Sequence, residues 1–233
     1  MRYISILIFI FSFVYSSSQT TINVSLKKEL DSIYKLHQMF ISFTYDMEEG
    51  SKKTDSLMNV YNFKNPEQLG VYLLKLQRSY DSSNIRRIKE IFKQYGYPGK
   101  TMVGSPADEV AFNVLRRYLN THEKEFPDYL PMLKTAADTK ELPFKLYAEA
   151  ADKNLMMQGK EQVYGTQITA ISITASSGIR ALKWMVWPIK DAATVNERRK
   201  AIGINKTVEQ IAKEQNFIYQ VYTLKDIKKM SGK

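Results

Sequence analysis

His122 is the residue of this sequence best suited to acid–base chemistry. It ends a row of apolar positions at three- and four-residue steps, Ala111, Leu115 and Tyr118, which predicts a core-facing side chain on a helix. Its imidazole titrates near neutral pH, so it could act as a general base or hold a ligand. A histidine here could also bond the last helical carbonyls and interact with the helix dipole. The sequence leaves both roles open.

Asp152 is the second candidate for catalysis. Apolar residues flank it at four-residue steps, Phe144, Ala148 and Met156, which predicts a partly buried carboxylate. A buried charge needs a partner, and Arg199, on the inward face of its own predicted helix, is the natural one. We therefore expect an Asp152–Arg199 ion pair. This pairing is compatible with catalysis, because a guanidinium can orient a carboxylate and still donate to an anionic ligand.

The segment Tyr164-Gly165-Thr166-Gln167 is polar, aromatic and turn-like at once. In a strand, Tyr164 and Thr166 would face one way, and Gly165 and Gln167 the other. Glycine inside a strand often marks a bulge or the close approach of a backbone or ligand, and a glutamine amide can both donate and accept. The segment is either one wall of a ligand pocket or a structural junction between helices and a sheet.

Other chemistries find little support. The chain has two histidines and no cysteine, so a cysteine nucleophile is excluded. His122 and Glu125 have a His-x-x-Glu spacing, but Phe126–Pro127 follows at once, and a catalytic zinc usually has three protein ligands. Neither a glycine-rich phosphate loop nor a Gly-x-Ser-x-Gly or Ser-x-x-Lys motif occurs. We expect neither a metal nor a cofactor.

These candidates lead to two functional hypotheses. In the first, a polar pocket binds an unknown small molecule and is formed by His122, Asp152, Tyr164, Gly165, Thr166, Gln167 and Arg199. If such a protein is an enzyme, hydrolysis is the simplest chemistry, with His122 as base and Gln167 or Arg199 stabilising negative charge. In the second, the protein is a non-catalytic interaction module that recognises a protein partner or a cell-envelope component, and the same residues hold the fold.

Helices must position most of these groups. Apolar periodicity, capping residues and first-turn prolines predict helices over residues 25–49, 65–80, 82–96, 105–122, 128–138, 143–159, 193–203 and 207–215. Residues Gln162–Ile189 are instead rich in β-branched and aromatic types, with a turn signal at 176–178, which predicts an antiparallel hairpin. A bare hairpin is barely stable, so it must lie on the helices. We expect a mainly helical (α+β) fold in a single domain, residues 19–233.

The N-terminus has the pattern of a cleaved signal peptide. Arg2 precedes an apolar run, Tyr3–Tyr15, and Ser16 and Ser18 supply the small residues before a cut after Ser18. A membrane anchor is the alternative, but the run is shorter than the roughly 20 residues that span a bilayer. The remaining chain has no comparable segment. We therefore expect an exported protein, periplasmic or secreted, without a stable membrane span after cleavage.

The composition fits a globular protein, with 44% hydrophobic and 25% charged residues. Without cysteine it has neither disulfides nor a lipid-carrying cysteine, so stability must come from its core. The formal net charge of +10 could suit nucleic acid, acidic glycans or an anionic membrane. Basic residues are, however, scattered among acidic ones outside the C-terminal tail, residues 225–233, and nucleic-acid-binding motifs are missing. We expect no nucleic-acid partner.

Several motifs together resemble one bacterial family, the domain of unknown function numbered six-six-two-four. They are "YGYPGKTMVG" (Tyr95–Gly104), the helix ending at His122, "GKEQVYGTQ" (Gly159–Gln167) and "WPIKDAATVNERRKAIGI" (Trp187–Ile204). The resemblance covers roughly residues 81–204 and, more weakly, the first helix. It implies a fold and a shared set of polar residues, but no known activity.

The sequence departs from that family's pattern at three places. Thr121 stands where the family usually has Gln, and Lys153 where it usually has Arg. In the first helix, His37–Gln38 replaces the usual Asp-Gln pair. Thr121 and Lys153 adjoin the two candidate catalytic residues in the sequence, so these departures bear directly on any catalytic interpretation.

Overall fold

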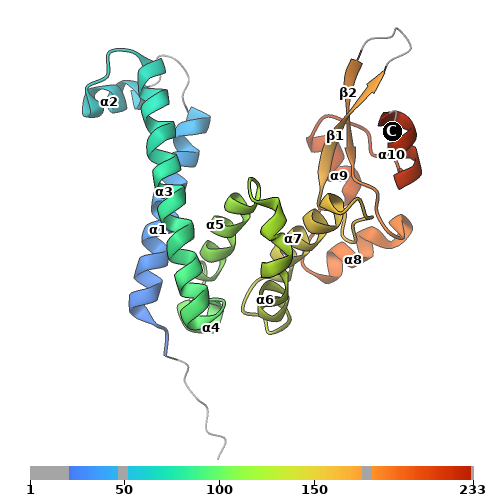
Figure 1. Ribbon diagram of the computed structural model, residues 1–233, viewed down its shortest axis with the longest axis horizontal. Helices are drawn as coiled ribbons and strands as arrows, with labels where there is room; N and C mark the ends of the chain where they lie inside the picture. The colour runs from blue at the N-terminus through green and yellow to red at the C-terminus, as the bar shows by residue number, and fades with distance from the viewer. Residues whose placement is uncertain (1–20, 47–51, 175–179, 232–233) are drawn as a thin grey trace, which may run out of the picture.

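The computed structural model describes residues 21–46, 52–174 and 180–231 and has the outline of a V (Figure 1). One arm holds the first three helices, short helices form the base, and the other arm holds a β-hairpin with the last helices. The predicted signal peptide, residues 1–18, and the predicted turn at 176–178 lie outside the described residues. Within the described part of the chain, no helix has both the length and the apolarity to cross a membrane.

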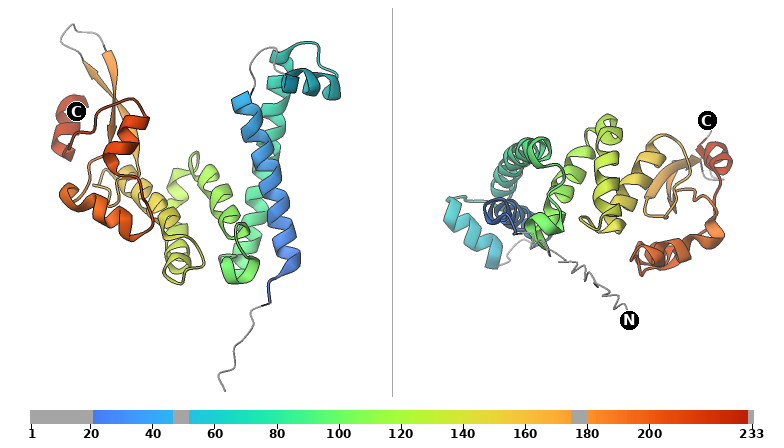
Figure 2. Two further views of the ribbon diagram at one scale, coloured as in Figure 1. Left: turned by 180° about the vertical axis from the view of Figure 1, so that it is seen from behind. Right: turned by 90° about the horizontal axis from the view of Figure 1, so that it is seen from below.

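The first arm consists of two long helices and a short one. Helix α1 (Val24–Asp46) lies beside α3 (Pro66–Tyr95), and α2 (Lys52–Tyr61) sits at the tip of the arm (Figures 1 and 2). Leu30, Ile88 and Ile91 are fully buried between the two long helices. Burial of each such side chain stabilises the fold by about 1.5–3 kcal/mol.

Helix α3 corrects one prediction. The sequence predicted two helices, over residues 65–80 and 82–96, whereas α3 is continuous for 30 residues. The Asn65 cap with Pro66 behind it was identified correctly, and the Asn65 side chain accepts a hydrogen bond from the Gln68 amide at 2.8 Å. The serines after Asp81 do not interrupt the helix, because Ser82 Oγ donates to the Arg78 carbonyl at 2.9 Å inside it.

Short helices form the base of the V. In chain order they are α4 (Lys100–Val103), the 3₁₀ turn η1 (Ala107–Glu109), α5 (Val110–Leu119), η2 (Glu123–Glu125), α6 (Phe126–Asp138) and α7 (Phe144–Met157). Phe112, Leu115, Phe126 and Leu133 form a buried cluster that joins α5 to α6. Helix α5 ends at Leu119 and not at His122, so the predicted helix is three residues too long at this end.

The second arm carries the hairpin. Strands β1 (Ile168–Thr174) and β2 (Arg180–Val186) pair antiparallel, from Ile168 opposite Val186 to Thr174 opposite Arg180. Around them lie η3 (Ala192–Thr194), α8 (Val195–Ala201), α9 (Val208–Glu214) and α10 (Leu224–Ser231), of which α10 contacts β1. The prediction of a mainly helical fold with a small antiparallel hairpin is confirmed. The first strand begins six residues later than the predicted hairpin segment, so the Tyr-Gly-Thr-Gln motif precedes the sheet.

Candidate functional site

Asp152, on α7, is fully buried and organises the loop before β1. One carboxylate oxygen accepts from the Val163 amide at 2.7 Å, and both accept from the Tyr164 amide at 3.1 Å. The second oxygen also accepts from the Thr166 amide at 3.1 Å and from its hydroxyl at 3.0 Å. Burial raises the pKa of Asp152, and these donors oppose that rise. The carboxylate therefore holds the loop as an anchor.

Arg199, on α8, binds the same loop from the other side. Its Nη1 donates to the Tyr164 carbonyl at 2.8 Å and to the Gly165 carbonyl at 3.1 Å, and its Nε donates to the Lys206 carbonyl at 2.7 Å. Burial lowers the pKa of Arg199, and the charge of Asp152 opposes that effect. The predicted direct Asp152–Arg199 ion pair is wrong, because the guanidinium bonds are made to backbone carbonyls. The two charges are instead joined through the loop.

Gly165 meets two structural demands at once. Its φ is 64°, in the left-handed region that residues with a side chain rarely adopt. A Cβ atom at this place would lie 2.8 Å from Val208 Cγ1 and 2.9 Å from Ile189 Cδ1. The expected strand alternation of residues 164–167 is therefore wrong. This segment is a loop pressed against α9 and the end of the hairpin.

Two further residues that the sequence reasoning did not select complete this junction. Gln162 is fully buried, and its Nε2 donates to the Trp187 carbonyl at 2.7 Å and to the Gln167 carbonyl at 3.1 Å. Arg198, beside Arg199, donates to the Val163 carbonyl at 3.1 Å and to the Lys190 carbonyl at 2.6 Å. The only sequence signal was position, because Arg198 adjoins Arg199 and Gln162 lies two residues before Tyr164.

His122 lies just beyond α5, exposed, with its ring stacked on Tyr118 at a centroid separation of 3.9 Å. Its Nδ1 lies 3.1 Å from the Tyr118 carbonyl and 2.9 Å from the Thr121 hydroxyl. The contact with the carbonyl matches the alternative in which the histidine bonds the last helical carbonyls.

A polar network continues from the Tyr118 ring. Its hydroxyl donates to Glu125 at 2.5 Å, and Lys89 donates to the Tyr118 hydroxyl at 3.1 Å and to Glu125 at 3.0 Å. The hydrogen bond from Tyr118, with that from Lys89, lowers the pKa of Glu125. Tyr118 therefore links the helix end that carries His122 to a pair of opposite charges.

The predicted site residues do not share one cavity. His122 lines a cavity of about 800 Å³ between α3 and α5, together with Tyr118 and Arg78. Gln167 lines a different cavity of about 340 Å³ between α5 and α7. Arg117 and Asn120 line both, so the cavities are neighbours across the end of α5. Asp152, Gly165 and Arg199 are buried behind the wall of this second cavity that contains Gln167. The proposed convergence of His122 with the other candidates is therefore wrong.

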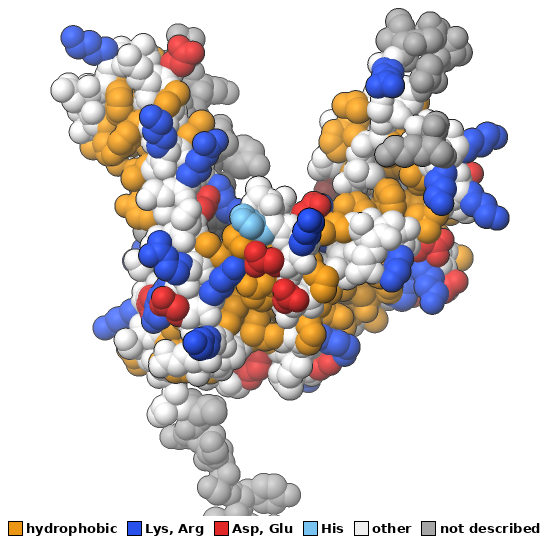
Figure 3. All heavy atoms as spheres, viewed as in Figure 1, with side chains coloured by type: hydrophobic (Ala, Val, Ile, Leu, Met, Phe, Trp, Pro, Cys, Tyr) orange, Lys and Arg blue, Asp and Glu red, His pale blue; other side chains and the backbone are white. Residues whose placement is uncertain are grey.

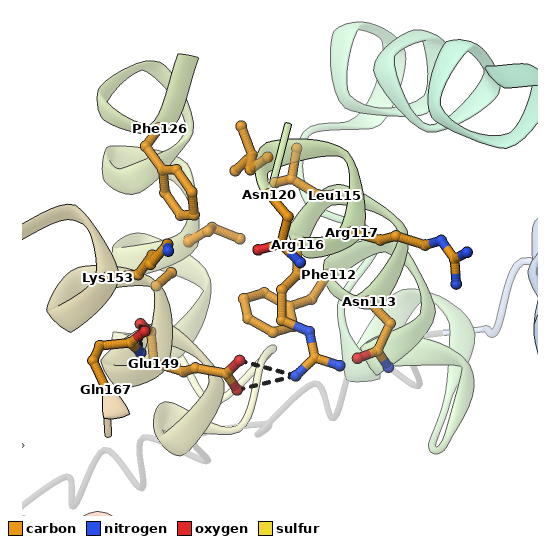
Figure 4. A pocket seen from close by; sticks show the side chains of 13 residues that line it. Phe112, Asn113, Leu115, Arg116, Arg117, Asn120, Phe126, Glu149, Lys153 and Gln167 are labelled. Atoms are coloured by element: carbon orange, nitrogen blue, oxygen red, sulfur yellow. Dashed lines mark hydrogen bonds and ion pairs between the residues drawn. The ribbon is translucent and has the colours of Figure 1, made fainter. Parts of the chain in front are cut away.

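The cavity between α5 and α7 combines an apolar floor with a polar rim (Figure 4). The floor is formed by Phe112, Leu115, Leu119, Phe126, Leu133 and Ala150. The rim has two sides, with Asn113 and Arg116 on α5 and Asn120 just after it facing Glu149, Lys153 and Gln167. In the space-filling view, acidic and basic side chains and a histidine lie side by side in the notch of the V (Figure 3).

The rim offers polar groups without strong partners. Lys153 Nζ is 3.7 Å from Glu123, beyond hydrogen-bond distance. The side-chain amides of Asn113 and Asn120 make no hydrogen bond within the described part of the chain. Arg116 Nη1 contacts both oxygens of Glu149, at 2.9 and 3.2 Å, across the mouth. Among the described residues, no group of three or more His, Asp or Glu side chains could hold a metal ion.

Comparison with known sequences assigns the chain to a family. Residues 57–225, well over half of its length, match the sequence profile of a family of unknown function, DUF6624. The chain belongs to this family. The match confirms the resemblance and extends beyond the residues 81–204 on which it was based. No curated protein and no solved structure matches the chain significantly.

In this DUF6624 protein, some of the residues discussed for the resemblance form the loop before β1, and others line the cavity between α5 and α7. Tyr164, Gly165 and Thr166 belong to the loop held by Asp152 and Arg199. Gln167 and Lys153 reach the cavity between α5 and α7. Lys153 is one of the positions where the sequence departs from the family pattern, so a departure stands directly at the rim of that cavity.

Proposed function

We propose that this DUF6624 protein is an exported binding protein that takes a small molecule with a carboxylate or phosphate group into the cavity between α5 and α7. The observation that carries the proposal is the Lys153 ammonium group at the rim, whose nearest carboxylate is 3.7 Å away. Ammonium and guanidinium groups bind carboxylates and phosphates through charge-assisted hydrogen bonds. Arg116 supplies a second cationic group on the opposite wall.

The shape of the cavity supports the same proposal. Its volume of about 340 Å³ lies at the lower end of the range for small-molecule sites. An apolar floor with a few convergent polar groups is the usual build of such sites. The amides of Asn113 and Asn120 can donate to an anionic group or accept from a hydroxyl. The apolar floor would bury the rest of the ligand.

Binding is favoured over hydrolysis by the places of the predicted catalytic residues. Asp152 and Arg199 are buried and bonded to the loop backbone, so in this proposal they shape the wall that carries Gln167. Tyr164, Gly165 and Thr166 support the same wall through their backbone groups. His122 belongs to the neighbouring cavity, where it would contact only the far end of a long ligand.

The binding proposal is tested by calorimetric titration with a panel of small carboxylates and phosphates. Lys153→Met should weaken binding of a panel member by about tenfold or more, since a charge-assisted contact contributes about 1.5–3 kcal/mol. Lys213→Met, on the exposed surface of α9, is the matched control and should leave the affinity unchanged. Equal binding by wild type and Lys153→Met, or no binding by the whole panel, would refute the proposal.

Export is a separate part of the proposal and rests on the N-terminal pattern of Arg2, the apolar run and the small residues before Gln19. Expression of the full-length chain in a bacterial host should yield a product that begins at Gln19 outside the cytoplasm. N-terminal sequencing of fractionated cells measures this directly. An uncleaved product that starts at Met1 in the cytoplasm would contradict export.

A second candidate function rests on the hairpin. Leu182 and Trp184 lie on one face of β2 and are 68% and 54% exposed, so the hairpin presents two neighbouring large apolar side chains to solvent. Such a face suits an interaction module that recognises a cell-envelope component. Trp184→Ala should then abolish co-sedimentation with purified cell envelope, whereas Leu74→Ala, an equally exposed apolar residue on α3, should not. Equal sedimentation of both variants would exclude this function.

A further inference from the structure

We infer that the ligand of the cavity between α5 and α7 is an α-amino acid with an apolar side chain, bound as a zwitterion. This inference rests on the proposed binding function and specifies the class of ligand. Its starting point is the ion pair between Arg116 and Glu149, which joins the two walls at the rim (Figure 4). The Glu149 carboxylate at the mouth would repel a simple anion, whereas it can bind a ligand that also carries a positive charge.

The charges of the rim are complementary to a zwitterion. Among the described lining residues, Glu149 is the only carboxylate. Lys153 and Arg116 supply two cationic groups, while Arg117 points away from the cavity and pairs with Asp81 at 2.9 Å. A ligand carboxylate can bind the cationic groups, and a ligand ammonium can bind Glu149. Both ends of the ligand would then have a partner.

A second acceptor lies beside Glu149. The Nε2 of Gln167 donates to the Glu149 carbonyl at 3.1 Å and to the Thr166 hydroxyl at 2.9 Å. These bonds fix the orientation of the amide and leave its Oε1 without a hydrogen bond in the described part of the chain. An ammonium group has three donors and needs several acceptors. Glu149 and Gln167 together provide such a set.

The ion pair can open to admit this ligand. The Arg116 side chain is 44% exposed and that of Glu149 is 34% exposed. Partly exposed ion pairs contribute little to stability, because water competes for both charges. Exchange of the Arg116–Glu149 contact for contacts with a ligand carboxylate and a ligand ammonium replaces this one ion pair by two.

The floor of the cavity selects the side chain of the ligand. Phe112, Leu115, Phe126 and Leu133 lie below the rim and belong to the core between α5 and α6. A charged ligand side chain would be desolvated there without a partner, at a large cost. An apolar side chain would gain from burial in proportion to its area. The site is therefore matched to leucine- or phenylalanine-like amino acids.

Titration with chemically blocked ligands tests the inference on the wild-type protein. L-Leucine and L-phenylalanine should bind at least about tenfold more tightly than their N-acetyl forms, which lack the ammonium, and than their amides, which lack the carboxylate. N-acetyl forms that bind as tightly as the free amino acids would overturn the inference and leave anion binding standing. Binding by other small anions but by neither amino acid would have the same meaning. If no small carboxylate or phosphate binds, the amino acids included, the proposed function itself fails.

Glu149→Gln supplies the matched variant. It keeps the shape of the side chain but removes its charge, so the preference for the free amino acid over its N-acetyl form should fall by about tenfold. Equal losses for both forms, or no loss for either, would overturn the assignment of Glu149 to the ammonium. Circular dichroism checks that the variant is folded. If it is not, the comparison of ligand forms on the wild type decides alone.

Discussion

Asp152 and Arg199 hold opposite sides of the same loop without touching each other. The carboxylate accepts from the amides of residues 163, 164 and 166, and the guanidinium donates to the carbonyls of residues 164 and 165. A buried loop must satisfy its backbone groups inside the protein. Two buried charges do so here, one for the N–H groups and one for the C=O groups. The wall that carries Gln167 depends on both.

Replacement of Asp152 by Asn should destabilise the protein strongly. The amide end of Asn would point donors at backbone donors, and the negative charge that the buried guanidinium of Arg199 feels would be lost. We expect the free energy of unfolding to fall by about 3 kcal/mol in urea denaturation. Glu161→Gln, an exposed acid nearby, is the control and should change it by less than about 0.5 kcal/mol. Equal stability of the two variants would refute the anchor role.

Gly165→Ala should cost more than the same change at another left-handed glycine. At Gly165 the new Cβ meets the side chains of Val208 and Ile189 below 3 Å, whereas at Gly203, with a φ of 81°, nothing lies within 4 Å. Gly203→Ala should therefore lower the free energy of unfolding only by the strain of a left-handed backbone, about 1–2 kcal/mol. Gly165→Ala should lose a further amount of about 1–3 kcal/mol from overpacking. Chemical denaturation of both variants measures the difference between their free energies of unfolding. Equal losses would mean that the loop shifts away from Val208 and Ile189, and would contradict this prediction.

Much of the fold was predictable because its rules are local. Caps such as Asn65 and Thr207, and apolar spacing, located most of the helices, and the four-residue row on α7 correctly placed Asp152 in the core. The partners of Asp152 were not predictable, since they are backbone amides, which every residue has and no side-chain pattern reveals. Gln162 was missed for the same reason, because its buried amide bonds only to backbone groups.

The position of His122 shows that a small error in a predicted helix end can assign a side chain to the wrong cavity. Side-chain direction on a helix turns by about 100° per residue. Because α5 ends at Leu119, residues beyond it no longer follow the apolar row, and His122 turns back onto Tyr118. The cavity that it lines then opens toward α3 instead of α7. A three-residue difference in one helix end thus separated His122 from the other candidates.

The Tyr118 network predicts a defined pH dependence. The Tyr118 hydroxyl is the main cause of the lowered pKa of Glu125. A carboxylate with a lowered folded pKa stabilises the protein above its unfolded pKa, about 4.3, and this contribution is lost as pH falls through the folded value. Tyr118→Phe should raise the pKa of Glu125 and reduce that acid-dependent loss. An NMR titration of the Glu125 carboxyl measures the pKa, with Tyr95→Phe as the control. An unchanged pKa would contradict the network.

A double-mutant cycle tests whether Asp152 and Arg199 act through the loop. Either Asp152→Asn or Arg199→Met alone should release the loop, so the second change should cost less once the first is made. We expect a coupling free energy of about 1 kcal/mol or more, a size otherwise typical of residues in contact. Asp152→Asn combined with Lys93→Met, on the exposed surface of α3, should be additive within about 0.5 kcal/mol. Additivity of the Asp152 and Arg199 changes would mean that the two residues hold the loop independently, and that the Gln167 wall has two separate supports.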